Sequence, residues 1–273
     1  MPELPEVEVV CQGLRPLLIG QTFGQIRSSG RSLRLPVPVA ALRRWAAGAM
    51  VLAVRRRGKY LVVGLDNQAS LIFHLGMTGR LGLFPEGTAL ASHDHLCLLL
   101  SEGMELRFND TRRFGSIQVL APGQDEALHF AALGPEPLLE EFSADYLAAK
   151  GARRSQPVKN FLMDSRVVVG IGNIYASEIL HEAEISPLRP TNQLTVQAWK
   201  ALVAQTRCVL LRAIAAGGST IDNFANASGQ PGYFQLELKV YGRHGKSCQR
   251  CGGMIVKETL AGRSTFRCTG CQR

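Results

Sequence analysis

The end of the chain carries four cysteines in two close pairs, Cys248 with Cys251 and Cys268 with Cys271. Two residues separate the members of each pair, and sixteen residues separate the pairs. Each pair can supply two thiolates on a tight knuckle, and two knuckles close a tetrahedral zinc site. A disulfide interpretation would require an oxidising compartment, which nothing in the sequence supports. Because four sulfurs leave no open position, the spacing predicts one structural Zn²⁺ that helps to fold a segment too short for its own core.

The composition indicates a large globular protein with an anionic partner. Its 273 residues are 46% hydrophobic, enough for a sizeable core and for two domains. A formal net charge of +9 favours nucleic acid, because Lys and Arg release its counterions on binding. With no apolar run of about 18 residues and no signal-peptide pattern, we expect an intracellular protein without a membrane partner. The remaining cysteines, Cys11, Cys97 and Cys208, are expected as small core side chains.

The first half of the chain, from Thr22 to Leu120, has the pattern of a β-rich domain. Short segments rich in Val, Ile, Leu and Phe alternate with glycines and polar turns, which predicts a β-sandwich or barrel and not βαβ units. The clearest strands are Val51–Arg55, Tyr60–Leu65, Ser70–His74 and His95–Leu100. Before them, Pro5–Leu18 has apolar residues at helical spacing, so a helix is predicted there.

After a linker-like segment at Ala121–Asp125, the hydrophobic period becomes helical. A long helix that ends at Gly217 is predicted from an apolar face of Val196, Trp199, Leu202, Val203, Leu210 and Ile214. Shorter helices are expected around Phe142–Lys150, Lys159–Asp164 and Asn173–Ala183. Between the cysteine pairs, Ile255–Thr259 and Ser264–Arg267 predict a β-hairpin with Arg263 at its tip. That arginine is either a solvated turn residue or a side chain that enters a DNA groove.

The N-terminus combines an amine and a carboxyl that can carry out chemistry. After removal of Met1, Pro2 becomes a secondary amine, which condenses with an aldehyde to give an electron-withdrawing iminium. An α-amino group titrates near ~8, so a neutral fraction exists at cellular pH. Glu3 stands beside it and can donate and accept a proton. Alternatively, Pro2 merely follows the start, and Glu3 and Glu6 favour the positive end of a helix.

Three more segments are typical of contacts with DNA or phosphate. Arg55–Tyr60 joins two strands with a cationic cluster, although a run of arginines is more often a solvated face. Asn109–Gly115 places two arginines beside an aromatic ring. Val167–Tyr175 carries a glycine-spaced turn into a helix and can present backbone amides to a phosphate. Its glycines lack the downstream acid of a dinucleotide-binding fingerprint.

Together these motifs resemble the bacterial formamidopyrimidine-DNA glycosylase family, essentially from end to end. The resemblance is carried by Met1–Glu6, His74–Met77, His93–His95, Thr111–Gly115, Gly172–Glu178, Pro231–Phe234 and the four-cysteine tail. It implies an α+β protein with an N-terminal β-sandwich and terminal helix, a helix-two-turns-helix domain and a C-terminal zinc finger. We therefore expect domains at residues 1–125, 126–243 and 244–273. We also expect a monomer that binds damaged double-stranded DNA in the bacterial cytoplasm, at the nucleoid.

The activity that the resemblance implies is bifunctional base excision repair. Pro2 would attack C1′ of an oxidised purine nucleotide, such as 8-oxoguanine or a formamidopyrimidine, and β,δ-elimination would cleave the strand. Glu3 would move protons around the opening sugar, and Lys59 matches the catalytic lysine of the family. The base must leave the stack first, because its glycosidic carbon cannot be reached inside a duplex.

The resemblance also implies which residues bind the duplex. The DNA-binding set is His93, Arg112, Lys159, Asn173, Tyr241 and Arg263, with Asn173 and Arg263 as phosphate clamps. The void left by the extruded nucleotide would be filled by Met77, Arg112 and Phe114. The lesion-recognition loop would include Asn226, Gly229, Gln230, Gly232 and Tyr233. Gln230 stands where some members carry lysine, and Thr111 stands where proline is frequent.

Two other functions stay open at this point. The endonuclease VIII branch of the same superfamily shares Pro2, Glu3 and the zinc finger but prefers oxidised pyrimidines. Leu4 and the glycine- and proline-containing loop after Ala225 favour the purine branch. A catalytically inert, zinc-dependent DNA-binding protein would explain the charge and the finger, but it leaves Pro2, Glu3 and Lys59 without a role.

Overall fold

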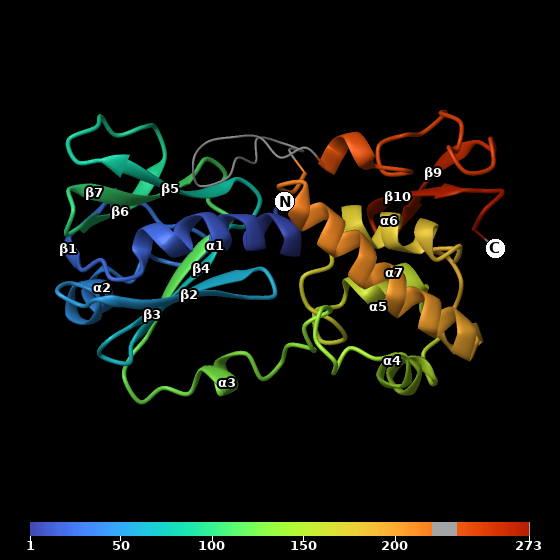
Figure 1. Ribbon diagram of the computed structural model, residues 1–273, viewed down its shortest axis with the longest axis horizontal. Coiled ribbons are helices and arrows are strands. Elements are labelled where there is room, and N and C mark those ends of the chain that lie inside the picture. The colour runs from blue at the N-terminus through green and yellow to red at the C-terminus, as the bar shows by residue number, and fades with distance from the viewer. Residues whose placement is uncertain (220–233, 273) are drawn as a thin grey trace. The chain divides into compact units, whose positions relative to one another are not determined.

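The computed structural model describes residues 1–219 and 234–272. Two compact units make up the chain (Figure 1). Unit 1 contains residues 1–130 with 216–233, and unit 2 contains residues 131–215 with 234–273. Among the described residues, no helix is long and apolar enough to cross a membrane.

Unit 1 is an antiparallel β-sandwich, as the spacing of its apolar segments predicts. One sheet has the strand order β1-β6-β7-β5 and the other has the order β2-β3-β4-β8. The strands are β1 (Phe23–Ser28), β2 (Val51–Arg57), β3 (Tyr60–Leu65), β4 (Ser70–His74), β5 (Gly79–Pro85), β6 (Asp94–Leu100), β7 (Met104–Asp110) and β8 (Ser116–Leu120). Side chains that alternate along the strands fill one core, to which Phe23, Phe73 and Phe108 contribute the largest rings.

Helix α1 (Leu4–Leu18) lies against strands β2 and β3 and confirms the predicted N-terminal helix. Its buried row faces the sandwich core and consists of Val7, Val10, Cys11, Leu14 and Leu18. The short helices α2 (Val39–Trp45) and α3 (Glu126–His129) complete the unit. Burial of the α1 row fixes the start of the helix, and with it the position of Pro2 and Glu3.

The first part of unit 2 is helical, as the period of its sequence predicts. Its helices are α4 (Ala144–Gly151), α5 (Val158–Met163), α6 (Asn173–Glu182), α7 (Val196–Ala215) and the 3₁₀ turns η1 (Thr191–Gln193) and η2 (Phe234–Glu237). Two expectations on α7 are wrong. Val196 is 60% exposed because it begins the helix before the buried row, and Cys208 is exposed because it lies on the outer face.

The tail of unit 2 is the predicted β-hairpin. Strands β9 (Ile255–Leu260) and β10 (Arg263–Cys268) pair in antiparallel register, with Arg263 opposite Leu260. A small cluster of Val240, Cys248, Ile255, Phe266 and Cys268 forms its core. So small a cluster is consistent with a segment that needs a metal ion to fold.

Candidate active site and metal centre

Pro2 and Glu3 lie buried at the start of α1. Glu3 is the N-cap residue and is 2% exposed. Its backbone N–H donates to Glu6 Oε2 over 2.8 Å, which is one half of a capping box. The proline that can become the terminal amine is therefore followed by a carboxyl in a fixed place at the positive end of a helix.

Glu6 has a second set of contacts that no sequence pattern predicts. Its Oε1 accepts from the Ser219 backbone N–H over 2.8 Å and from Ser219 Oγ over 2.9 Å. Gly218 has a φ of 79°, and a Cβ there would lie 3.2 Å from Glu6 Oε1. Glu6 therefore ties the first turn of α1 to the end of the described segment at Ser219. The only local signal is a second glutamate at capping-box spacing, which says nothing about a distant partner.

Five predicted lesion-recognition residues follow Ser219 in the sequence. They are Asn226, Gly229, Gln230, Gly232 and Tyr233, and all five lie outside the described residues.

Lys59 lies in the two-residue turn between β2 and β3, where Arg57 pairs with Tyr60. Arg56 connects this turn to α1. Its Nε donates to Glu8 Oε2 over 2.8 Å, and its Nη1 donates to the Gly58 carbonyl over 3.1 Å. The Arg56 side chain is only 9% exposed, so this arginine does not belong to a solvated face.

His74 marks the polar environment beside this turn. It pairs with Tyr60 across β3 and β4, with the two ring centroids 4.9 Å apart. Burial, together with the positive charges of Lys59 and Arg34, lowers the pKa of His74 to about 4. The imidazole is therefore neutral at physiological pH, and the positive charge around it comes from Lys59 and Arg34.

The predicted void-filling residues lie on two turns that touch each other. Met77 follows β4, and Arg112 and Phe114 precede β8. The Arg112 guanidinium lies 4.8 Å above the Phe114 ring centroid, and Phe114 is 46% exposed. A Cβ on Gly76 would lie 2.4 Å from the Gly115 nitrogen, so only glycine at 76 allows this approach.

Asp110 locks the same two turns together and is fully buried. Its Oδ1 accepts from Thr78 Oγ1 over 2.5 Å, and its Oδ2 accepts from the Gly115 N–H over 2.8 Å. The Arg112 N–H donates in turn to Thr78 Oγ1 over 3.0 Å. These hydrogen bonds hold an exposed aromatic ring and an arginine on a rigid support. Insertion of a side chain between stacked nucleobases requires such a support.

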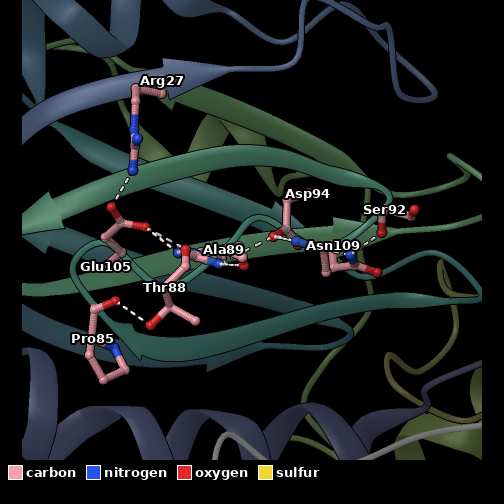
Figure 2. A network of polar contacts seen from close by, with 10 residues as sticks. Arg27, Pro85, Thr88, Ala89, Ser92, Asp94, Glu105 and Asn109 are labelled. Atoms are coloured by element: carbon pink, nitrogen blue, oxygen red, sulfur yellow. Dashed lines mark hydrogen bonds and ion pairs between the residues drawn. The ribbon is translucent and has the colours of Figure 1, made fainter.

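His93 lies at the end of the loop between β5 and β6, with a φ of 73°. A network of polar contacts holds this loop against the sheet (Figure 2). Buried Arg107 donates from Nη1 to the Ala89 carbonyl over 3.0 Å. Asn109 donates from Nδ2 to the Ser92 carbonyl over 2.8 Å. His93 itself is exposed, so its position is set by the loop backbone beside it.

In unit 2, three predicted DNA-binding residues lie close to Ser264 at the start of strand β10. Lys159 Nζ donates to the Ser264 carbonyl over 3.0 Å and to Thr265 Oγ1 over 2.8 Å. Asn173 Nδ2 donates to the same Ser264 carbonyl over 3.0 Å. Arg263 precedes this residue, is exposed and borders a pocket of about 210 Å³ that Lys159 also lines. The structure therefore brings Lys159, Asn173 and Arg263 together.

Tyr241, also predicted to bind DNA, lies between η2 and β9 and packs against the same hairpin. Its ring packs against Phe266, with the two centroids 5.0 Å apart. Its backbone N–H donates to Glu178 Oε1 over 2.7 Å. Glu178 is 2% exposed, and burial raises its pKa.

The four cysteines of the tail form a metal-binding cluster. Their sulfur atoms all lie within 4.8 Å of one another. The Cys248 and Cys271 sulfurs are 3.8 Å apart, and those of Cys251 and Cys268 are 3.4 Å apart. Sulfurs at the corners of a Zn–S tetrahedron would lie about 3.8 Å apart. The residues therefore fit one structural Zn²⁺.

Three family models cover nearly the whole chain. The formamidopyrimidine-DNA glycosylase N-terminal domain matches residues 1–117, and the H2TH domain of the same enzyme matches residues 133–225. The zinc finger found in FPG and IleRS matches residues 245–273. The chain belongs to the formamidopyrimidine-DNA glycosylase family. The predicted family and its three-part fold are thereby confirmed.

Proteins similar to this chain include members of the family from several bacteria. The formamidopyrimidine-DNA glycosylase of Xanthomonas oryzae pv. oryzae is 45% identical over 273 residues, with all of both chains covered. A Lactococcus lactis FPG mutant in complex with Fapy-dG containing DNA matches with a TM-score of 0.92 and 33% identity over all of both chains. Wild-type Lactococcus lactis FPG, in complex with DNA that contains an oxidised pyrimidine, matches with a TM-score of 0.90, 33% identity and the same coverage.

Proposed function

We propose that this chain is a bifunctional DNA glycosylase of base excision repair. It removes oxidised purines, including 8-oxoguanine and formamidopyrimidines, from duplex DNA and then cleaves the strand. One observation carries the proposal, namely that buried Pro2 stands directly before the N-cap Glu3 in a formamidopyrimidine-DNA glycosylase chain. The names of the relatives and the DNA in their complexes support the same substrate class.

The reaction begins at Pro2 once Met1 has been removed. The proline nitrogen attacks C1′ of the extruded nucleotide, and the glycosidic bond breaks as the base leaves with the bonding electrons and takes up a proton. The proline nitrogen then loses its proton and the C1′–O4′ bond of the sugar ring breaks, which leaves nitrogen and C1′ joined as an iminium and makes C2′ more acidic. Loss of the C2′ proton expels the 3′ phosphate, and a second elimination expels the 5′ phosphate.

Glu3 and Lys59 assist these steps. Glu3 protonates the sugar ring oxygen as the ring opens and accepts the C2′ proton, in line with general acid–base catalysis. Lys59 supplies positive charge close to the departing phosphates, since the neutral His74 leaves that task to its cationic neighbours.

Residues of both units hold the duplex. Met77, Arg112 and Phe114 fill the void, because an apolar wedge opens the stack and an arginine can pair with the orphaned base. His93, Lys159, Asn173, Tyr241 and Arg263 belong to the DNA-binding surface, with Asn173 and Arg263 as phosphate clamps. Asn226, Gly229, Gln230, Gly232 and Tyr233 form the lesion-recognition loop.

Zn²⁺, when bound by the four cysteines, stabilises the finger and supplies no reaction chemistry, because its coordination is complete. We also propose three functional domains, at residues 1–125, 126–243 and 244–273. The protein acts as a monomer in the bacterial cytoplasm, at the nucleoid.

The test is strand cleavage on three matched duplexes, which carry 8-oxoguanine, an oxidised pyrimidine or no lesion. We expect cleavage at 8-oxoguanine, with phosphate left on both sides of the gap. Cleavage confined to the pyrimidine duplex would instead indicate endonuclease VIII activity. The Lactococcus lactis complex with an oxidised pyrimidine is the reason to include that duplex. Binding without any cleavage would indicate an inert DNA-binding protein.

A further inference from the structure

Helix α6 and the zinc-binding tail belong to the same unit, and α6 packs against strand β10 (Figure 1). Polar contacts follow the helix along its length. Glu178 accepts hydrogen bonds from three successive backbone N–H groups of the tail, at Lys239, Val240 and Tyr241, over 2.7 to 3.0 Å. Near the C-terminal end of α6, His181 reaches the metal centre itself.

His181 Nε2 lies 3.5 Å from Cys248 Sγ. Both side chains are buried, His181 at 2% and Cys248 at 3% exposure. The other ring nitrogen, His181 Nδ1, is buried and has no hydrogen-bond partner within the described part of the chain. No pattern in the sequence marks this histidine.

The chemistry of the sulfur decides which ring nitrogen carries the proton. A zinc-bound thiolate has no proton and can only accept a hydrogen bond. A 3.5 Å contact with Cys248 Sγ therefore requires a hydrogen on His181 Nε2. This tautomer also avoids an N–H at Nδ1, where the described residues offer no acceptor.

Four thiolates around one Zn²⁺ leave excess negative charge on the sulfurs, and N–H donors stabilise it. Backbone N–H groups serve three of the four sulfurs, each over 3.4 Å: Arg250 to Cys248, Gly253 to Cys251 and Cys271 to Cys268. Cys248 has the His181 side chain as an additional donor. It is thus the sulfur through which α6 can act directly on the metal centre.

The surroundings keep the imidazole in place. Arg250 donates from Nη1 to the His181 carbonyl over 3.3 Å and to Glu184 Oε1 over 3.0 Å. Gln272 donates from Nε2 to the Ile185 carbonyl over 3.0 Å, so the far end of the tail is also fixed just beyond α6. His181 is therefore preorganised as a donor and does not need to be drawn into place by the metal.

We propose that His181 is an outer hydrogen-bond donor to the zinc-binding thiolate of Cys248, through which α6 and the zinc finger stabilise each other. The inference is independent of the proposed reaction. It requires only that the tail binds the metal for which its cysteines are arranged. Such partners typically strengthen metal binding 10–100-fold.

The experiment compares zinc transfer from the full-length holoprotein to a chromogenic chelator in wild type and three variants. His181→Phe fills the volume without a donor, and it should weaken zinc binding about 10–100-fold. His181→Gln retains an N–H donor and should recover part of the loss. The matched control is His244→Phe, an exposed histidine of the tail, which should behave as wild type.

Cobalt substitution separates hydrogen bonding from packing. Removal of a donor to the sulfur changes the electron density that the sulfur gives to the metal, so the sulfur-to-cobalt charge-transfer band should shift in His181→Phe and much less in His181→Gln. An unchanged charge-transfer band in His181→Phe, or unchanged zinc transfer from that variant, would overturn the proposal. If His181→Phe does not fold, His181→Ala takes its place, and the same loss of zinc affinity and the same band shift are expected.

Mutual stabilisation has a separate readout in hydrogen exchange. Removal of zinc from the wild-type protein should speed the exchange of backbone amides in Asn173–Glu182 relative to those of Leu4–Leu18 in the other unit. Equal protection of α6 in the metal-free and zinc-bound proteins would contradict the coupling.

Discussion

Arg56 Nε donates a 2.8 Å hydrogen bond to Glu8 Oε2, and this bond joins the N-terminal helix to the turn that carries Lys59. The same guanidinium donates to the Gly58 carbonyl, one residue before that lysine. The two side chains are 9% and 18% exposed, so water competes little for their charges. Pro2 lies just before this helix and Lys59 lies in this turn. The Arg56–Glu8 contact therefore connects the two elements of unit 1 that carry the proposed catalytic groups.

We expect Arg56→Met to lower the free energy of unfolding by roughly 1.5–3 kcal/mol, the range of a hydrogen bond to a charged group. Urea unfolding of Arg56→Met, Glu8→Ala and the double variant measures how strongly the pair is coupled. Arg55→Met is the control, because the Arg55–Glu126 pair is more exposed and should contribute less than about 1 kcal/mol. Simple additivity in the Arg56–Glu8 cycle would show that the contact contributes nothing.

His74 should make the protein sensitive to acid. Its pKa is lowered from 6.5 to about 4 in the folded protein, so the unfolded chain binds this proton more readily than the native one. Stability is therefore unaffected above pH 6.5 and falls between 6.5 and 4, by on the order of 3 kcal/mol. Denaturant unfolding across this range should be less pH-dependent in His74→Asn than in wild type, with exposed His129→Asn as the control. Parallel profiles for His74→Asn and wild type would contradict this assignment.

Much of this fold follows from local sequence patterns. Ser70–His74 and Tyr60–Leu65 are predicted with their observed bounds because apolar runs end at turn residues. The zinc site is predicted because its ligands lie in two short knuckles. Local spacing also suffices to predict that Glu3 and Glu6 lie at the start of helix α1.

Contacts between distant segments leave no such signal. The bond from Ser219 to Glu6 and the contact of His181 with Cys248 depend on tertiary packing, and no local sequence pattern marks Ser219 or His181. The sequence predicts Cys208 as a buried core side chain, and this prediction is wrong for a related reason. A cysteine among apolar neighbours on a helix can still face outward when the buried row passes beside it.

Glu3→Gln should separate chemistry from binding. The amide keeps the size of the side chain but cannot move protons, so base removal should fall about 10²–10⁴-fold while lesion binding persists. Single-turnover excision and affinity on one 8-oxoguanine duplex measure the two effects. Glu102→Gln is the control, since that side chain is exposed on a turn. Near-normal turnover in Glu3→Gln would exclude Glu3 from the reaction.

Arg263→Ala should weaken binding to damaged and undamaged duplexes alike. If the guanidinium grips a phosphate, the slope of log affinity against log salt should fall by roughly one unit. Excision should fall further than binding, because a misplaced sugar no longer reaches the amine at reacting distance. A salt titration of both duplexes provides the measurement, with exposed Lys200→Ala on α7 as the control. An unchanged slope, or a loss confined to the lesion duplex, would rule out a phosphate contact.

Borohydride trapping tests whether the terminal amine of Pro2 is the nucleophile. Reduction during turnover converts the iminium into a stable amine, so protein and lesion-bearing DNA should become covalently joined. Peptide mapping of the adduct then locates the bond. We expect an adduct on Pro2 in a chain that has lost Met1, and none on undamaged DNA. An adduct on Lys59, or no adduct under conditions in which the strand is cleaved, would contradict it.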